Sequence, residues 1–194
     1  MNMYQPFDFT VLVLCGGESS RMKTDKGLVN FNGRPLILNI LDVVQSITDK
    51  VILIANDKRY TELGFQCYSD IYPGIGPMGG IYTGLKYSET KKNIVLSCDM
   101  PFMTAEFLTA LIRNTGDEEI LVPVHDGIIE PLAGVYDSIC KSTLQQNIIE
   151  GMLKMRDYLR EQKTRLIEVK EIYSGAEKIF TNINTPEELL KYEN

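Results

Sequence analysis

Short runs of β-branched and other apolar residues, separated by segments of helical periodicity, constrain the fold of this chain most strongly. The runs TVLVLC (10–15), KVILIAND (50–57) and NIVLSCD (93–99) have the continuous hydrophobicity of strands that are covered on both faces. Strands that alternate with helices form right-handed crossovers, a parallel sheet, and ligand sites at the carboxyl ends of the strands. The pattern therefore predicts a Rossmann-like α/β fold with a mostly parallel central sheet and helices on both faces.

Further elements are expected along the whole chain. Pro35 is expected at the first position of a helix whose apolar residues run from Leu36 to Ile47. Further strands are predicted at 65–69, 119–124, 131–137 and 165–172, and further helices at 76–88, 104–114, 140–162 (broken near Gly151) and 186–193 (capped by Thr185). The sequence shows no repeat or linker, so we expect a single domain over residues 1–194.

Composition limits the kinds of partner. The chain has 20 basic and 26 acidic residues and a net charge of −6, which argues against nucleic acid or an anionic membrane as a partner. Its four cysteines are widely spaced, without a C-x-x-C pair, and are expected to be reduced core residues. No signal peptide and no long apolar run is visible, so a cytoplasmic protein is expected.

The segment after the first strand concentrates the cations of this acidic chain. In CGGESSRMKTDK the pair Gly16–Gly17 can turn backbone N–H groups toward phosphate oxygens, while Arg21 and Lys26 supply positive charge. The alternative is an ordinary surface loop with solvated side chains. Because no G-x-x-x-x-G-K-[ST] is present, a P-loop kinase or GTPase loses its main support.

Two carboxylates are candidates for the same site. Asp99 follows a predicted central strand, at the edge where ligands bind, and suits Mg²⁺ shared with substrate phosphates. A turn cap is the alternative role for Asp99. Asp70 follows a weaker strand, and for it the sequence leaves metal binding and turn capping open.

The segment GIGPMG (74–79) matches the dinucleotide-binding pattern G-x-G-x-x-G, with Asp99 at the required distance. The preceding segment is a poor buried strand, and Pro73 and Pro77 remove two N–H donors. These glycines are therefore predicted to let a helix approach a ligand or a strand closely, with an NAD(P)-binding protein as the alternative.

Ordered motifs resemble one known family. LVLCGGESSRMKTDKGLVNFNGRPLI is similar to the L-A-G-G-x-S-x-R-M-G-x-D-K-x-L loop of nucleotidyltransferases, in detail that of the molybdenum cofactor guanylyltransferases. DIYPGIGPMGGIYTGL, VLSCDMPFMT, EPLAGVYD and FTNINTPEEL resemble later segments of the same family, in the same order. The resemblance implies the nucleotide-diphospho-sugar transferase type of fold.

The resemblance also implies an activity: transfer of GMP from GTP to molybdopterin carrying molybdenum, with release of pyrophosphate and with Mg²⁺ as cofactor. Proteins that deliver or receive the cofactor would be partners. By matching positions, the resemblance implies that the nucleotide contacts Leu14, Cys15, Gly16 and Gly17, that its phosphates contact Lys26, and that its guanosine end contacts Asn56 and Asp70. Asp99 would bind GTP and Mg²⁺, and the catalytic residues would be Arg21, Lys26 and Asp99. The residues on the pterin side would be Asn182, Asn184 and His125.

Two departures and several alternatives accompany this interpretation. Cys15 stands where the family usually has alanine, and Lys23 replaces the glycine of R-M-G.

The nearest alternatives are a molybdenum cofactor cytidylyltransferase and a sugar-phosphate pyrophosphorylase of the same fold. A non-catalytic nucleotide-binding adaptor is a further alternative, but an adaptor has no need for a metal carboxylate such as Asp99. For His125, a structural role in its turn is as plausible as a pterin contact.

Overall fold

The computed structural model describes residues 8–15, 25–175 and 177–192 of the chain. Its strands are β1 (Phe9–Leu14), β2 (Asn30–Phe31), β3 (Arg34–Pro35), β4 (Val51–Ile54), β5 (Gln66–Tyr68), β6 (Lys92–Ser97), β7 (Ile120–His125), β8 (Ile128–Ile129), β9 (Val135–Asp137) and β10 (Thr164–Glu168). Its helices are α1 (Ile37–Gln45), α2 (Pro77–Tyr87), α3 (Ala105–Arg113), α4 (Cys140–Ile149), α5 (Met155–Glu161), α6 (Val169–Ile172) and α7 (Pro186–Tyr192), with 3₁₀ helices η1 (Lys26–Leu28), η2 (Lys58–Leu63), η3 (Pro131–Ala133) and η4 (Glu177–Phe180).

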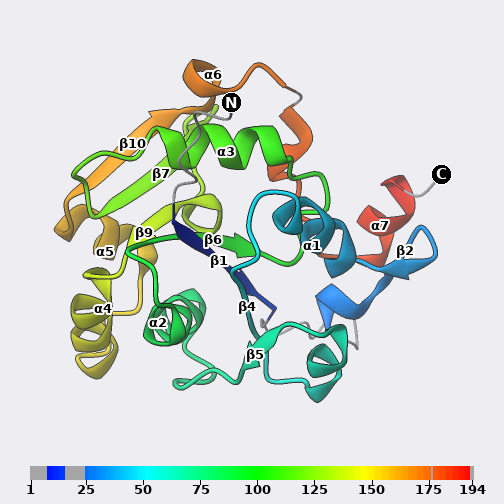
Figure 1. The fold of residues 1–194 in the computed structure, drawn as a ribbon, viewed down its shortest axis with the longest axis horizontal. Coiled ribbons are helices and arrows are strands. Elements are labelled where there is room, and N and C mark those ends of the chain that lie inside the picture. Colours follow the sequence, from blue (N-terminus) through cyan, green and yellow to red (C-terminus); the bar gives the residue numbers. More distant parts are fainter. Residues whose placement is uncertain (1–7, 16–24, 176, 193–194) are drawn as a thin grey trace, which may run out of the picture.

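The described residues form an eight-stranded central sheet in the order β10-β7-β9-β6-β1-β4-β5, with β8 paired to β7 (Figure 1). The pairs β1–β4, β1–β6, β4–β5 and β10–β7 are parallel, whereas β9 runs antiparallel to β6 and β7. The chain passes from β1 outward to β4 and β5, and then crosses back through α2 to β6 on the other side of β1. The carboxyl ends of β1, β4 and β6 therefore meet at a topological switch point. The mostly parallel α/β sheet expected from the sequence is confirmed.

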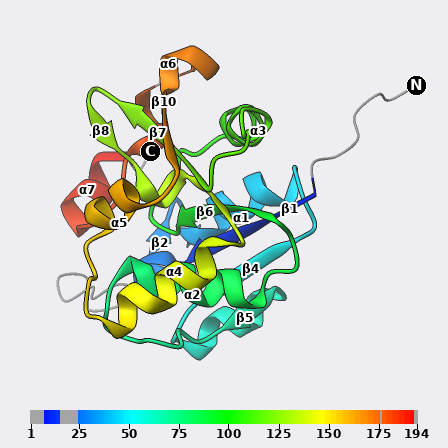
Figure 2. The same cartoon turned by 90° about the vertical axis from the view of Figure 1, so that its left-hand side faces the viewer.

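Helices cover both faces of the sheet. Alternate residues of β1 divide between two apolar cores: Val11 and Val13 pack with α1 and α3, and Leu12 and Leu14 pack with α2, α4 and α5. Figure 2 shows α3 on the opposite side of the sheet from α2 and α4. Burial on both faces explains why these strands are continuous apolar runs rather than alternating ones.

The glycine-rich helix α2 lies very close to β1. A Cβ atom at Gly84 would stand 2.7 Å from Leu12 Cδ1, and one at Gly80 would stand 3.2 Å from Leu14 Cδ2. The prediction that these glycines allow close approach to a strand is confirmed. The helix follows the edge strand β5, not a central strand, which is not the setting of a dinucleotide-binding turn.

Two predictions for individual elements are wrong. Pro35 does not begin a helix: it lies in β3, and α1 begins at Ile37. The reason is the Asn32–Gly33 turn, whose φ values of 51° and 83° fit the type I′ hairpin that joins β2 to β3. In segment 131–137 only Val135–Asp137 is a strand, because Pro131 opens the 3₁₀ helix η3.

The second half of the chain otherwise follows the sequence pattern, except that the strand predicted at 165–172 ends at Glu168 and residues 169–172 form the helix α6. Segment 140–162 contains the two helices α4 and α5, separated at Gly151, where φ is +72°. Thr185 accepts a hydrogen bond from the Glu188 amide, and the Glu188 carboxylate accepts one from the Thr185 amide, which is a capping box for α7. Ile183 and Leu189 pack with Phe31 and Leu36, so the C-terminal segment is held against the β2–β3 hairpin (Figure 1).

The four cysteines are free, and Cys15, Cys98 and Cys140 are buried, as the sequence predicts. Among the described residues there is no helix with both the length and the hydrophobicity needed to cross a membrane.

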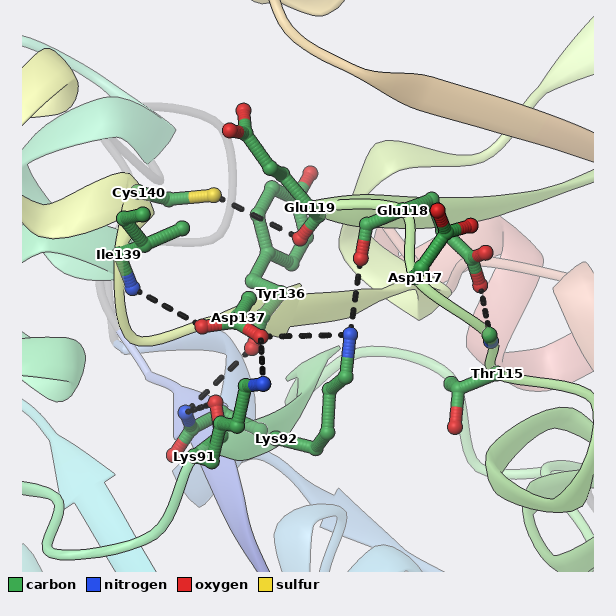
Figure 3. A network of polar contacts seen from close by, with 12 residues as sticks. Lys91, Lys92, Thr115, Asp117, Glu118, Glu119, Tyr136, Asp137, Ile139 and Cys140 are labelled. Carbon is green, nitrogen blue, oxygen red and sulfur yellow. Dashed lines mark hydrogen bonds and ion pairs between the residues drawn. The ribbon is translucent and has the colours of Figure 1, made fainter.

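A polar network at the amino end of the sheet holds the antiparallel strand β9 in place (Figure 3). The Lys92 ammonium lies 3.3 Å from the Asp137 carboxylate and donates a 2.8 Å hydrogen bond to the Glu118 carbonyl. The Asp137 side chain is only 8% exposed and also accepts a 3.1 Å hydrogen bond from the Ile139 amide. Lys91, which is 79% exposed, lies farther away at 3.9 Å. Lys92 is therefore the main counter-ion of a buried carboxylate.

Replacing Lys92 by methionine is expected to lower the free energy of unfolding by about 2–3 kcal/mol, because it leaves Asp137 buried with only a distant cation. Urea unfolding measures the loss. The matched change Lys91→Met removes an exposed charge and is expected to cost less than about 1 kcal/mol. Equal losses for the two variants would contradict the assignment.

Candidate active site

A cavity of about 570 Å³ opens at the carboxyl ends of β1, β4 and β6. Each of these strands contributes its last residue to the wall: Leu14, Ile54 and Ser97. The other described lining residues are Asp25, Asn56, Asp70, Gly74, Gly76, Pro77, Gly80 and Leu132. The start of α2 thus closes one side of the cavity, at the position where an open α/β sheet binds its ligand.

Three polar side chains that are far apart in the sequence meet beside this cavity. Lys26 Nζ lies 3.2 Å from Asp99 Oδ2 and also donates to Asn184 Oδ1. Asp99 Oδ1 accepts a 2.6 Å hydrogen bond from the Ser97 hydroxyl. The Asp99 side chain is only 9% exposed and that of Lys26 is 24% exposed. The structure therefore holds one cation and one carboxylate together, largely shielded from water.

Backbone contacts fix this arrangement. The Ile183 amide donates a 2.9 Å hydrogen bond to the Asp99 carbonyl, which fixes the C-terminal segment next to the end of β6 and brings Asn184 to Lys26. The Cys98 amide donates a 3.1 Å hydrogen bond to the Leu14 carbonyl, so the chain stays paired with β1 one residue before Asp99. Asp99 thus leaves the sheet from a rigid strand end.

Asp25 and Tyr60 support the turn that carries Lys26, and neither was among the residues predicted from the sequence. Asp25 caps η1 by accepting a 3.3 Å hydrogen bond from the Gly27 amide, and the wholly buried Tyr60 donates its hydroxyl to the same carboxylate. Burial raises the pKa of Asp25 above its usual range, and these two hydrogen bonds lower it only in part. Burial also raises the pKa of Tyr60, which keeps its hydroxyl protonated as a donor.

Gly27 has no space for a side chain. A Cβ atom there would stand 2.4 Å from the Tyr60 hydroxyl oxygen and 3.1 Å from Cys98 Sγ. Contacts below 3.0 Å require atoms to move, and Tyr60 is enclosed by the core. The turn that carries Lys26 therefore rests directly on the tyrosine.

Gly27→Ala is expected to lower the free energy of unfolding by about 2 kcal/mol because it overpacks this contact. Adding Tyr60→Phe removes the atom nearest to the new methyl group, so the double variant is expected to show a favourable coupling energy in urea unfolding. Gly116→Ala is the control, since its new methyl group meets only the end of the Glu118 side chain, at 3.0 Å, and lies away from Tyr60. Additive effects of the Gly27 and Tyr60 changes would contradict the proposed contact.

Asn56 and Asp70 form the wall of the cavity at the end of β4 and β5. Asn56 Oδ1 accepts a 3.0 Å hydrogen bond from the Asp70 amide. Asp70 Oδ1 accepts hydrogen bonds of 3.1 Å from both the Tyr72 amide and the Thr83 hydroxyl. Burial raises the pKa of Asp70, with these hydrogen bonds acting in the opposite direction. Of the two roles left open by the sequence, the structure shows turn capping, and Asp70 also lines the cavity.

The remaining candidate residues have different locations. Gly16, Gly17 and Arg21 lie outside the described residues. Cys15 is buried beneath the site at the end of β1, and Asn182 is half-buried two residues before Asn184. His125 does not line this cavity; it lies at the end of β7, in the wall of a second one.

The donor set of the site limits which metal it can take. Among the described residues no group of three or more His, Cys, Asp or Glu side chains gathers in the way a closed metal site requires. Asp99 offers a single largely buried carboxylate beside a cavity. This matches Mg²⁺, which commonly uses one or two carboxylates and completes its coordination with phosphates and water.

Comparison with known proteins identifies the family. The family model described as "MobA-like NTP transferase domain" matches residues 11–166, which include all or most of each strand of the central sheet and both Lys26 and Asp99. The chain belongs to the MobA-like NTP transferase family. In this family member the cavity at the ends of β1, β4 and β6 is the candidate active site.

Relatives of this MobA-like protein match it over nearly its full length. A protein from Flavobacterium johnsoniae named "Probable molybdenum cofactor guanylyltransferase" is 37% identical over 181 residues, covering 93% of this chain and 94% of its own. A protein of the same name from Carboxydothermus hydrogenoformans is 32% identical, with 95% and 96% covered. The crystal structure of molybdopterin-guanine dinucleotide biosynthesis protein A from Archaeoglobus fulgidus has a TM-score of 0.81 at 26% identity, covering 94% of this chain and 95% of that one.

Proposed function

We propose that this protein transfers a GMP unit from GTP to the phosphate of molybdopterin carrying molybdenum, releasing pyrophosphate. The observation that carries the proposal is the partly buried Lys26–Asp99 pair beside the cavity that Asn56 and Asp70 line. The names of its relatives support this particular donor and acceptor.

The chemistry asks for positioning and positive charge. An oxygen of the acceptor phosphate forms a bond to the α-phosphorus of GTP while the bond from that phosphorus to the bridging oxygen breaks, and pyrophosphate leaves with the electron pair. The acceptor phosphate is already mostly ionised near neutral pH, so no general base is required. Lys26 would neutralise charge on the phosphates, and its contacts with Asp99 and Asn184 would hold its ammonium group in place.

Asp99 is the residue proposed to hold Mg²⁺ together with the GTP phosphates. When bound, the ion would neutralise charge on the phosphoryl oxygens and on the leaving group. The Ser97 hydroxyl, 2.6 Å from Asp99 Oδ1, would orient the carboxylate for this role. Asn56 and Asp70 are proposed to face the guanosine end of the nucleotide, because they line the part of the cavity farthest along the sheet from the C-terminal segment.

Calorimetric titration of the purified protein with GTP, CTP, ATP and NAD, each with and without Mg²⁺, tests the donor. We expect GTP to bind most tightly and to require Mg²⁺ for full affinity. A preference for CTP would move the assignment to cytidylyl transfer, and binding of NAD alone would overturn nucleotidyl transfer. Release of pyrophosphate from GTP in the presence of molybdopterin then separates an enzyme from an adaptor, because an adaptor binds without turnover.

A further inference from the structure

The C-terminal segment supplies one of the two contacts that the Lys26 ammonium group makes with the described part of the chain. Asn184 Oδ1 accepts a hydrogen bond from Lys26 Nζ, and Asp99 Oδ2 lies 3.2 Å from the same nitrogen. An ammonium group has three N–H donors, so these two contacts leave one donor for a phosphate oxygen. Asn184 lies beyond residue 166, where the match to the family model ends. A segment outside the matched region therefore helps to orient the main cation of the site.

Asn184 differs from Asp99 because it is a neutral acceptor. Its amide oxygen takes a hydrogen bond from Lys26 without neutralising the ammonium charge. A second carboxylate in its place would surround Lys26 with two negative charges and would repel an incoming phosphate. The pair of acceptors thus fixes the direction of the ammonium group while one positive charge is balanced by only one carboxylate. This arrangement depends on how precisely Asn184 is held.

Glu188 holds the backbone of Asn184. Its Oε2 atom accepts a 2.7 Å hydrogen bond from the Asn184 amide and a 3.2 Å hydrogen bond from the Thr185 amide. A capping box uses only the second of these bonds, the one to the residue that caps the helix. The shorter bond reaches one residue farther back, to the residue whose side chain contacts Lys26. The Glu188 carboxylate therefore does more than cap α7.

Apolar packing attaches this segment to the protein independently of Glu188. Ile183 and Leu189, on either side of Asn184, are buried in one cluster with Phe31 of the β2–β3 hairpin (Figure 1). The Ile183 amide also donates a 2.9 Å hydrogen bond to the Asp99 carbonyl. Loss of the Glu188 carboxylate should therefore leave α7 in place and change only the local backbone at Asn184.

We propose that Glu188 is a positioning residue of the active site, which holds Asn184 so that its amide oxygen keeps the Lys26 ammonium group in place for a nucleotide phosphate. Glu188 itself contacts no substrate and acts through Asn184. The proposal rests on the proposed function, because it takes Lys26 as the residue that meets the phosphates of GTP.

Binding of GTP with Mg²⁺, measured by calorimetry without molybdopterin, tests this role without turnover. We expect Glu188→Ala to weaken GTP binding by about tenfold, the scale of one lost hydrogen bond to a charged group. Glu188→Gln keeps an acceptor oxygen for the Asn184 amide and should restore most of the affinity. Glu187→Ala removes the exposed neighbouring carboxylate in the same turn of α7 and should bind GTP as the unmodified protein does.

Thr185→Ala separates positioning from helix capping. It removes the oxygen that accepts the Glu188 amide, so it weakens the cap of α7, but it leaves the hydrogen bond from the Asn184 amide to Glu188. Hydrogen exchange of the α7 amides should therefore become faster in both Thr185→Ala and Glu188→Ala. GTP affinity should fall only in Glu188→Ala and stay within about twofold in Thr185→Ala. Equal losses of affinity would mean that binding follows the stability of α7, and would overturn the positioning role.

A double variant tests the route through Asn184. Once Asn184→Ala has removed the contact with Lys26, adding Glu188→Ala is expected to cause no further loss of GTP affinity. A further tenfold loss would mean that Glu188 acts by another route.

The unmodified protein distinguishes failure of this proposal from failure of the proposed function. If it transfers GMP and Glu188→Ala binds GTP equally well, the positioning role is wrong while the function stands. If it binds GTP without transferring GMP, and binding still falls in Glu188→Ala alone, the reaction is wrong while the positioning role stands. A protein that binds no GTP overturns both.

Discussion

Asp99→Asn is expected to lower kcat by about 10³-fold, which is the scale of losing one preorganised electrostatic group in an active site. Asparagine has the same shape and can keep a hydrogen bond with the Ser97 hydroxyl, but it removes the charge that faces Lys26 at 3.2 Å. It also removes the only proposed protein ligand of Mg²⁺. Pyrophosphate release measured over a range of Mg²⁺ concentrations checks the effect.

The control for this variant is Asp42→Asn, which removes a carboxylate that is 59% exposed and pairs with Arg34 away from the cavity. Its kcat should equal that of the unmodified protein. Circular dichroism should show both variants folded, since neither changes the packed core. Full turnover of Asp99→Asn at saturating Mg²⁺ would remove Asp99 from the proposed mechanism.

The general position of the site was predictable because a parallel sheet brings the carboxyl ends of its strands to one edge. Leu14, Asn56 and Asp99 lie at the ends of three runs that are recognisable as buried strands, and the structure brings the ends of these strands to one cavity. The contact between Lys26 and Asn184, in contrast, joins residues that are 158 positions apart. No local pattern encodes such a distance, and only the family resemblance directed attention to Asn184.

The support beneath Lys26 was missed for a related reason. Asp25 directly before a short turn is a capping signal that local rules can detect, and the structure confirms the cap. Tyr60 carries no such signal, because its buried hydroxyl reaches Asp25 from a 3₁₀ helix 35 residues away. The hairpin at Asn32–Gly33 was missed although its dipeptide is a strong hairpin signal, since the neighbouring Pro35 also fits a helix start.

His125 shows how a local motif can have two roles. Asp126 and Gly127, with φ of 49° and 75°, form the type I′ turn that joins β7 to β8, so this part of the motif is structural. The imidazole itself points to Glu130 and Phe180 in the second cavity. The sequence predicts the turn from Asp-Gly, but the stacking partner lies 55 residues later in the chain and depends on how the C-terminal segment folds back.

Lys26→Met is expected to weaken GTP binding and to lower kcat, with a combined loss in kcat/KM of about 10²–10³-fold. The ammonium group is the one described cation in contact with Asp99, and methionine keeps most of its apolar stem while removing the charge. Lys50→Met, which disrupts an exposed ion pair with Asp8, is the control and should leave kcat/KM unchanged.

The double variant Lys26→Met/Asp99→Asn decides whether the two residues act as one unit. Their direct contact and shared neighbours predict a strong coupling, so the double variant should be little slower than the worse single variant. Fully multiplicative losses would mean that each residue acts on the substrate independently. In that case the contact between them would describe only the ligand-free protein, and the positioning role assigned to Asp99 toward Lys26 would be wrong.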